Sequence, residues 1–595
     1  MEENFRFKVN LGGMIDILAN HLYSSPDVFL RELLQNAVDA IRAKELIEEN
    51  WKEGKIEIDL YEGSTIVFQD NGTGLTEEEM HKFLAVIGQS SKRDLETGAI
   101  NEEYIGRFGI GMLSCFMVSD EIVVHTNSEK DNKSWEWRGK PDGTYSIKEL
   151  TDGCDRGTTI YLKCKESCKE YFQQEKIKEL VNYYGMLLPY PILLSCNGIT
   201  TQLNVVNLPW ESPFINKKEV MDFGEEVFGE QFLDYIPLYS EKGNVKGVAY
   251  ILPYKVQPNV KNNHRIYLKN MLLTENGANI LPDWAFFVKC ILNTTKLRPT
   301  ASREGFYEDE ILLSAQEELS ECIAKYLASL AKFDERRLAK IIQIHQLAIK
   351  SIAVENDELF KIFFDYLSFE TTRGEMSGFE LRTQIGTVVY TYEVDKFKQM
   401  SQVFTAQNRL LINVGYVYEL DLIHKLPEFY DVDIMELNEN EIEDVMEEIT
   451  IDEQEQSFIL IKVANLILKK FDCEADIRRY KPAQLPIFYT MDENAKIFRD
   501  IKRIKEKSSA MFFEMLDAFA EEIEESTFSK IYFNVDNPLV QKLMMITDEK
   551  KLGVCIEILY VQALLLGRFP LRNNEMEILN TGILKMIEWG LKDAY

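Results

Sequence analysis

The sequence has little of three things: cysteine, positive charge and long apolar runs. Its nine cysteines are scattered over 595 residues, which is typical of a reducing compartment and not of a secreted disulfide scaffold. Its 67 Lys and Arg residues stand against 98 Asp and Glu residues, a net charge of −31, which repels phosphate backbones and anionic lipid. No stretch reaches the roughly 18 apolar residues of a membrane-spanning helix, and the N-terminus lacks the basic and apolar regions of a signal peptide. We therefore expect a soluble, cytoplasmic protein that binds neither nucleic acid nor membrane.

The sequence does have ample material for several buried cores, because 45% of its residues are hydrophobic and 11% are aromatic. The three closest cysteines, Cys154, Cys164 and Cys168, lack a neighbouring His and the spacing of a zinc ribbon, so we expect them to be structural. Alternating helical and strand patterns indicate an α/β domain over the first 200 residues, with strands at 55–61, 65–69, 121–126 and 158–162. A connector follows at 204–214, and an acidic stretch at 431–456 precedes a mostly helical C-terminal segment.

A long helix is predicted over residues 25–49, with Ser25 as its N-cap and Pro26 at its first position. On this helix Glu32, Asn36 and Asp39 recur at i, i+4 and i+7, a spacing that aligns them along one side. A polar stripe of this kind is, on its own, more often a solvated face than a binding site. The glycine motifs that follow in the sequence favour a binding site over a solvated face.

Two glycine motifs come after this helix. The strand at 65–69 ends at Asp70-Asn71-Gly72-Thr73-Gly74, where glycines let the backbone turn tightly beside a carboxylate. Residues 106–111, Gly-Arg-Phe-Gly-Ile-Gly, precede an apolar segment, and such a turn can present backbone N–H groups to a phosphate. Either motif alone is weak, and a Rossmann site would need a preceding strand that residues 101–105 do not offer. The polar stripe followed in order by both glycine motifs is much stronger evidence for a nucleotide site than any one of them.

The combination of residues 29–40, Asp70-x-Gly72-x-Gly74, residues 106–111 and Gly157-Thr158 resembles the Bergerat nucleotide fold of the GHKL ATPases. Within that superfamily it most resembles the heat shock protein 90 chaperones of the bacterial high-temperature protein G type. Residues 265–289, the arginine-bearing loop at 300–304, and residues 534–540 with the helix around 562–566 resemble the later domains of that family. The resemblance implies an α/β (α+β) multidomain chain. Its parts would be a GHKL ATP-binding α/β sandwich at 1–205, an α/β middle domain with the catalytic-arginine loop and client contacts at 212–450, and a mostly helical C-terminal dimerisation domain at 451–595.

The resemblance also implies residue roles. Glu32 would be the general base, and Arg303 would stabilise charge developing at the γ-phosphate. Asp70 would accept a hydrogen bond from the adenine amino group, with Thr158 holding a bridging water, and the Asn36 side-chain oxygen would bind Mg²⁺. The implied nucleotide-binding residues are Asn36, Asp39, Ala40, Asp70, Gly74, Gly106, Arg107, Phe108, Gly109, Ile110, Gly111 and Thr158. The implied lid over the nucleotide contains Ser90, Ser91, Lys92 and Arg93.

The function implied by the resemblance is that of an ATP-dependent chaperone. A homodimer joined by its C-terminal helices would bind and slowly hydrolyse ATP with Mg²⁺, assisting the folding or remodelling of client proteins, as in a stress response. Tyr307 stands where many family members carry a catalytic-loop Gln, which predicts slower turnover, and the chain lacks the acidic tail that recruits tetratricopeptide cochaperones. Two alternatives remain open. One is a GHKL clamp on DNA of the MutL or gyrase B type, which the charge opposes; the other is an ATP-gated partner-binding scaffold, which Tyr307 favours.

Overall fold

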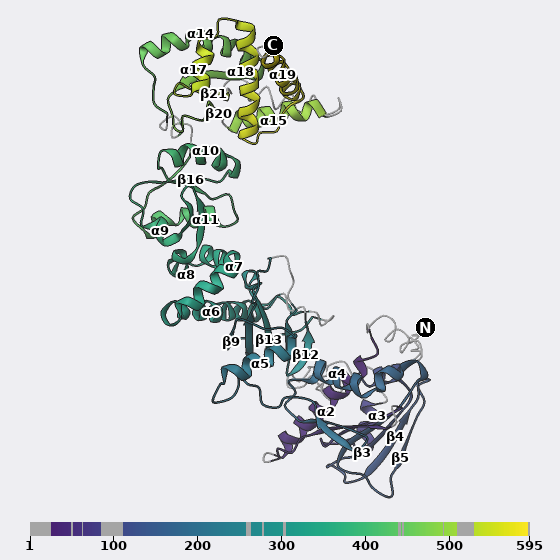
Figure 1. Ribbon diagram of the computed structural model, residues 1–595. Helices are drawn as coiled ribbons and strands as arrows, with labels where there is room; N and C mark the ends of the chain where they lie inside the picture. The colour runs from purple at the N-terminus through teal and green to yellow at the C-terminus, as the bar shows by residue number, and fades with distance from the viewer. Residues whose placement is uncertain are drawn as a thin grey trace, which may run out of the picture. The chain divides into compact units, whose positions relative to one another are not determined.

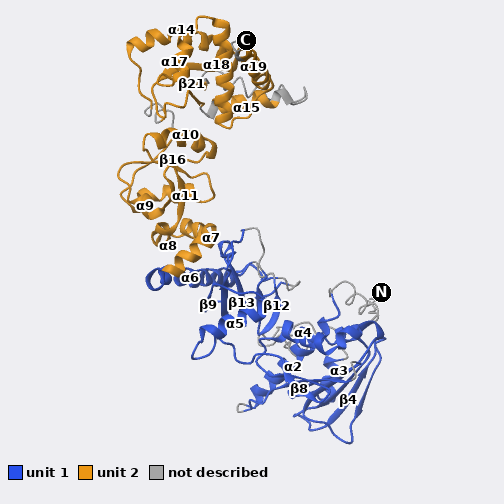
Figure 2. Cartoon of the chain, in the orientation of Figure 1, with its two compact units in different colours: residues 1–335 blue, residues 336–595 orange. Residues whose placement is uncertain are grey.

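The computed structural model describes residues 25–48, 51–61, 64–84, 111–257, 263–275, 279–300, 305–437, 442, 446–491, 493–507 and 529–592. The chain divides into two compact units, residues 1–335 and 336–595 (Figure 2). The described residues of each unit form two β-sheets with helices packed against them (Figure 1). The predicted fold class, a multidomain α/β chain with a mostly helical C-terminal segment, is confirmed. The domain boundaries expected near residues 205–212 and 450 remain predictions.

The first sheet of unit 1 has eight strands in the order β5-β4-β3-β6-β2-β1-β7-β8. Its neighbours are antiparallel except for the parallel pair β1 and β7. The strands are β1 Ile56–Tyr61, β2 Thr65–Asp70, β3 Ser119–Asn127, β4 Ser134–Gly139, β5 Tyr145–Glu149, β6 Gly157–Cys164, β7 Ile192–Cys196 and β8 Ile199–Gln202. Four of them, β1, β2, β3 and β6, confirm the strands expected from the sequence.

Helices cover this sheet through an apolar core (Figure 1). The helices are α2 Val28–Ile47, α3 Glu77–Phe83 and α4 Gln174–Gly185, with 3-10 helices η2 Gly111–Met117 and η3 Glu166–Phe172. Phe29 on α2 stacks on Phe172 with ring centroids 6.2 Å apart, and both rings are fully buried. This packing fixes α2 over the sheet, and with it the polar stripe that α2 carries.

The start of α2 differs from the sequence expectation. The helix begins at Val28, and Ser25 is not its N-cap. The Ser25 hydroxyl instead lies 3.4 Å from the hydroxyl of Tyr171, and the carboxylate of Asp27 accepts a hydrogen bond from Tyr184. The side chains of Ser25, the predicted N-cap, and of Asp27, the residue that precedes the helix, are thus engaged in tertiary contacts, which local sequence rules do not foresee.

The second sheet of unit 1 has the order β12-β11-β13-β10-β9. Its strands are β9 Asp234–Ser240, β10 Val245–Ile251, β11 Arg265–Leu268, β12 Met271–Thr274 and β13 Val288–Thr294, accompanied by α5 Lys217–Phe228, α6 Glu310–Phe333 and the 3-10 helix η4 Asp283–Ala285. No helix or strand lies between β8 and α5, all of whose intervening residues are described, so the connector expected at 204–214 is confirmed. The side-chain amide of Asn270 donates to the carbonyl of Leu187 and links this sheet to the first part of the unit.

Unit 2 also contains two sheets. The first has the strand order β15-β14-β17-β16-β18. Its strands are β14 Ser368–Thr371, β15 Gly374–Ser377, β16 Val388–Thr391, β17 Leu411–Asn413 and β18 Ile434–Glu436. The accompanying helices are α7 Glu335–Glu355, α8 Asp357–Phe363, η5 Phe364–Tyr366, α9 Gly378–Arg382, α10 Val394–Ala406, α11 Glu419–His424 and α12 Leu426–Phe429.

The second sheet of unit 2 has the strand order β19-β21-β20. Its strands are β19 Cys473–Arg478, β20 Ile487–Thr490 and β21 Ser529–Asn534. The accompanying helices are α14 Ile451–Leu468, η6 Lys469–Phe471, α15 Glu493–Lys507, α17 Pro538–Met544, α18 Glu549–Leu566 and α19 Asn573–Lys592.

Within the acidic stretch, the described residues include β18 and the first turn of α14. A capping box joins Thr450 and Glu453 at the start of that helix, which satisfies two backbone N–H groups. The acidic composition of 431–456 is compatible with either a solvated helix or a linker, and residues 451–456 are helical, as part of α14. Among the helices that the structure describes, none has both the length and the apolar character needed to cross a membrane.

Candidate functional site

A buried carboxylate, Asp70, lies at the end of β2. Only 5% of its surface is exposed, and its Oδ1 accepts a hydrogen bond of 2.9 Å from the backbone N–H of Gly72. Burial raises the pKa of Asp70 from 3.8 to about 7, against the lowering effects of the Gly72 hydrogen bond and the charge of Lys44. A carboxylate kept in so unfavourable a place is a candidate for a binding role.

Three glycines bring the backbone close around Asp70. A Cβ at Gly72 would lie 2.6 to 2.8 Å from atoms of Ala40 on α2. Gly74 has a φ of +64° and Gly157 a φ of +113°, and an added Cβ at Gly157 would lie 2.1 Å from the carbonyl oxygen of Asp70. Only glycine combines these left-handed torsions with such close approach. The turn after β2 is therefore held tightly between α2 and the start of β6.

The polar stripe on α2 is largely buried. Glu32 is 7% exposed and Asp39 is 2% exposed, while Asn36 and Ala40 are half-buried. The Glu32 Oε1 accepts a hydrogen bond of 2.9 Å from Arg31, and its Oε2 lies 2.5 Å from where a Cβ at Gly111 would stand. The stripe is thus not a solvated face: one end reaches Gly111, and the other end reaches the glycine turn, where Thr73 donates to the Ala40 carbonyl.

Sequence analysis missed two buried residues at this site. The Thr126 hydroxyl on β3 donates to the Gly157 carbonyl at 3.0 Å, accepts from the Leu75 N–H at 2.9 Å and lies 3.5 Å from the Thr158 hydroxyl. A Thr at an inward position of an apolar strand was the available signal for it.

The second missed residue is Lys44, on the last turn of α2. Its ammonium pairs with Glu129 at 2.8 Å, lies 3.4 Å from the carbonyl oxygen of Asn71 and stands 4.4 Å from the centre of the Trp51 ring. Lys44 thereby ties α2 to the turn after Asp70. A lysine at a helix C-terminus usually interacts with the helix dipole, so nothing in the local sequence distinguishes Lys44 from such a residue.

Several predicted site residues lie outside the described residues. These are Gly106, Arg107, Phe108, Gly109 and Ile110 of the second glycine motif, Ser90, Ser91, Lys92 and Arg93 of the expected lid, and Arg303. Tyr307 is described and half of its surface is exposed. Its N–H donates to the Arg298 carbonyl, and Pro299 pairs with Phe306, so the described residues on either side of 301–304 lie close together.

Comparison with known proteins identifies the first part of the chain. Residues 23–151 match the family described as histidine kinase-, DNA gyrase B- and HSP90-like ATPase. The chain is 29% identical over 432 residues to chaperone protein HtpG of Geobacter metallireducens, covering 63% of this chain and 64% of the relative. It is 26% identical over 409 residues to chaperone protein HtpG of Chlorobium chlorochromatii, covering 63% of each.

A third relative is the mitochondrial heat shock protein 75 kDa of Rattus norvegicus, 26% identical over 382 residues, with 59% of this chain and 52% of the relative covered. The chain thus spans less than two thirds of the length of these curated relatives. The matched family region contains α2, the Asp70 turn and Gly111, the same elements that form the buried carboxylate site. Residues 23–151 thus match the histidine kinase-, DNA gyrase B- and HSP90-like ATPases, and the longer alignments show that the chain is similar to chaperones of the heat shock protein 90 type.

Proposed function

We propose that the chain binds ATP with Mg²⁺ between α2 and the Asp70 turn and hydrolyses it slowly to drive the cycle of a dimeric, cytoplasmic chaperone. The observation that carries this proposal is the buried Asp70 carboxylate, whose pKa is raised to about 7, in a turn of glycines packed on α2. A protein keeps such a carboxylate at a cost to its stability, and recognition of a polar ligand accounts for that cost.

The adenine end of the ligand would meet Asp70. A carboxylate accepts from an amino group, and Thr158, which pairs with Asp70 across β2 and β6, offers a hydroxyl for a bridging water. Along α2, eight residues separate Ala40 at this end from Glu32 at the other, about 12 Å of helix at 1.5 Å per residue. That span suits an extended nucleoside triphosphate.

The phosphate end would meet Glu32 and Gly111. In this proposal Glu32 would draw a proton from the attacking water, and Gly109 and Gly111 would supply backbone N–H groups to the phosphates. Asn36 and the phosphates supply the oxygen ligands that Mg²⁺ prefers, and the ion would neutralise phosphate charge. Arg303 would complete the site by stabilising charge at the γ-phosphate. Tyr307 cannot supply an amide there, which favours slow turnover.

The direct test measures nucleotide binding and hydrolysis by the purified chain. We expect ATP and ADP to bind with Mg²⁺ present, phosphate release to be slow, and aggregation of an unfolded model protein to be suppressed. Binding without hydrolysis would favour the ATP-gated scaffold, and salt-sensitive binding of duplex DNA would favour the DNA clamp. The charge of −31 opposes that clamp.

Lys44→Met is expected to weaken ATP binding at pH 7 on the order of tenfold. The Lys44 charge lowers the pKa of Asp70, so its loss leaves less of the carboxylate ionised and able to accept a hydrogen bond. Affinity should recover as the pH is raised to 9, and Lys44→Arg should keep most of it. The matched control is Arg156→Met, which removes another cation from Glu129. A pH-independent loss of affinity in Lys44→Met would contradict the electrostatic role.

The proposed homodimer is supported by exposed apolar residues on α18 and α19. On α19 they fall at i, i+3 and i+7 of one stripe, Leu584, Ile587 and Leu591, which are 62%, 53% and 57% exposed. Leu565 and Leu566 at the end of α18 are about half exposed. Apolar surface of this extent calls for a partner.

Leu584→Glu is expected to convert the dimer to monomer at micromolar concentration. Burying one leucine is worth about 1.5–3 kcal/mol, and a twofold interface contains the residue twice, so the dissociation constant should rise by roughly two to four orders of magnitude. Sedimentation equilibrium measures this change. Lys585→Glu, the neighbouring exposed position, is the matched control and should stay dimeric. An unchanged Leu584→Glu dimer would place the interface elsewhere.

A further inference from the structure

Two buried arginines share a single carboxylate in unit 2. Glu575, in the first turn of α19, is fully buried and accepts from Arg499 Nη1 and Nη2 at 2.7 and 2.6 Å. It also accepts from the Tyr560 hydroxyl and from the Arg572 Nε and backbone N–H. Burial alone would raise the pKa of Glu575, but the Arg499 hydrogen bonds and charge outweigh burial and lower the pKa. The glutamate is therefore ionised, and both of its carboxylate oxygens accept hydrogen bonds.

Two donors of these guanidinium groups make no hydrogen bond among the described residues. Arg499 Nε is buried without an acceptor, and Arg572 Nη2 is paired with Glu575 Oε1 by charge at 3.1 Å but makes no hydrogen bond to it. Arg499 is only 8% exposed and Arg572 only 6% exposed, so bulk water does not serve these groups. A buried donor without an acceptor is costly, and two of them at one place indicate a missing ligand.

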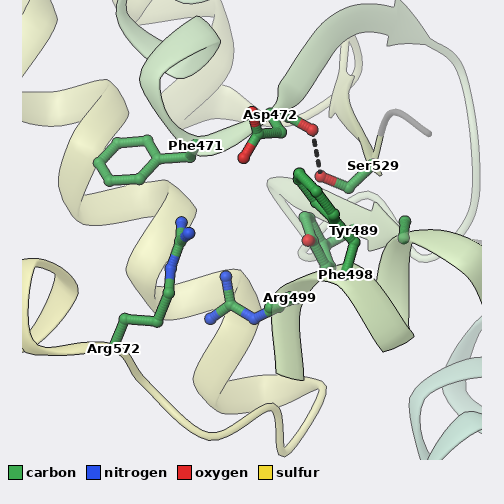
Figure 3. A pocket seen from close by; sticks show the side chains of 8 residues that line it. Phe471, Asp472, Tyr489, Phe498, Arg499, Ser529 and Arg572 are labelled. Atoms are coloured by element: carbon green, nitrogen blue, oxygen red, sulfur yellow. Dashed lines mark hydrogen bonds between the residues drawn. The ribbon is translucent and has the colours of Figure 1, made fainter. Parts of the chain in front are cut away.

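These arginines line a small cavity of about 20 Å³. Figure 3 shows the two guanidinium groups next to each other on one side of this space, across from Asp472 and Ser529. The space holds a single guest the size of a water or a monatomic ion. A phosphate or sulfate group exceeds it.

The charges around the cavity favour an anion. Among the residues that line the cavity or bond to the charged residues lining it, Arg499, Arg572 and Lys502 are cations, while Glu575 and Asp472 are anions. Within the part of the chain that the structure describes, these three cations stand against two carboxylates, which leaves one positive charge uncompensated. Asp472 is the one anionic side chain on the described wall, and its Oδ2 accepts from Lys502 at 2.7 Å, which offsets its repulsion of an anion.

We propose that this cavity binds a monatomic anion, chloride under ordinary conditions, through the N–H groups of Arg499 and Arg572. The anion balances the extra charge, supplies an acceptor for Arg499 Nε and offers Arg572 Nη2 the hydrogen bond that its ion pair with Glu575 does not provide. It joins α15, which carries Arg499, to Arg572 at the base of α19. Because only the folded chain assembles the cavity, bound chloride stabilises this part of unit 2 by mass action.

The test compares salts at constant ionic strength on the full-length chain. Chloride and bromide should raise the unfolding temperature of the C-terminal transition in a saturable way, and gluconate and sulfate should not. The ³⁵Cl resonance should show excess line width with the protein, and bromide should remove it. Equal stability in all four salts, with no excess line width, would show that a water occupies the cavity and would overturn the proposal.

Two variants separate binding from folding. Ala495 also lines the cavity, so Ala495→Val fills it while leaving every charged group in place, and it should abolish the chloride effect. Arg572→Lys keeps the positive charge beside Glu575 but removes Nη2, and it should weaken chloride binding by about tenfold. Arg503→Lys is the matched control, since Arg503 pairs with Asp500 on the surface of α15. A full chloride response in a folded Ala495→Val would overturn the assignment.

Discussion

Asp70→Asn is expected to bind adenine nucleotides roughly 10- to 150-fold more weakly than the natural chain and yet to unfold at a higher temperature at pH 8. The lost affinity follows from replacing a charged acceptor, whose hydrogen bond is worth about 1.5–3 kcal/mol. Folding should survive, because the Asn side-chain oxygen can still accept from the Gly72 N–H, which Asp70 holds at 2.9 Å. Isothermal titration with ADP measures the first effect.

The stability gain follows from the pKa of Asp70. Burial raises this pKa from 3.8 to about 7, so between these values the folded chain holds a proton that the unfolded chain has lost. The free energy of unfolding contributed by Asp70 therefore falls as the pH rises from about 4 to 7, and it stays at its lowest value above 7. A difference of about 3 pKa units corresponds to about 4 kcal/mol. Asparagine does not titrate and avoids this loss.

The advantage of Asp70→Asn should accordingly be absent near pH 3.8, grow through neutrality and level off above pH 7. Asp59→Asn, on the neighbouring strand β1, is the matched control, because it removes the same charge outside the site. Thermal unfolding at a series of pH values measures the difference. If Asp70→Asn bound ADP as tightly as the natural chain, or if its advantage did not depend on pH, the assignment of Asp70 as the adenine acceptor would fail.

Four of the eight strands of the first sheet and the presence of α2 could be predicted from the sequence, because their signals are local. Alternating apolar residues mark β1, β2, β3 and β6, and their register follows from the sheet that forms around them. The start of α2 was wrong, since Ser25 and Asp27 bond to tyrosines far along the chain. Contacts with residues so distant in the sequence cannot be predicted from the residues around the helix start.

At the candidate site, too, the residues with a local sequence signal could be predicted, and those that depend on tertiary contacts could not. Asp70 and its glycines were found because torsions such as the +64° of Gly74 demand glycine. The stripe containing Glu32 and Asp39 could not be assigned from its spacing, because charged stripes usually face water, and only burial against Gly111 and the turn decides it. Lys44 was missed because its partner Glu129 lies on a distant segment.

Glu32→Ala is expected to leave ATP affinity within about threefold of the natural value while lowering the hydrolysis rate by roughly 10²- to 10⁴-fold. General-base catalysis contributes about that factor, and a group that acts on the attacking water adds little to ground-state binding. Glu32 lies beside Gly111, at the far end of α2 from Asp70, so adenine contacts stay intact. Single-turnover phosphate release and equilibrium titration measure the two quantities separately.

Glu45→Gln is the matched control for this variant, since it neutralises another carboxylate of α2 about 20 Å along the helix. Glu45 accepts a hydrogen bond from the Tyr190 hydroxyl, which glutamine can also accept, so its turnover should be unchanged. Glu32→Gln should match Glu32→Ala in rate, because an amide keeps the shape and lacks the basicity. Natural turnover in either Glu32 variant would remove the general base from this site. A loss of ATP binding equal to the loss of rate would instead assign Glu32 to binding, leaving the catalytic base to another residue.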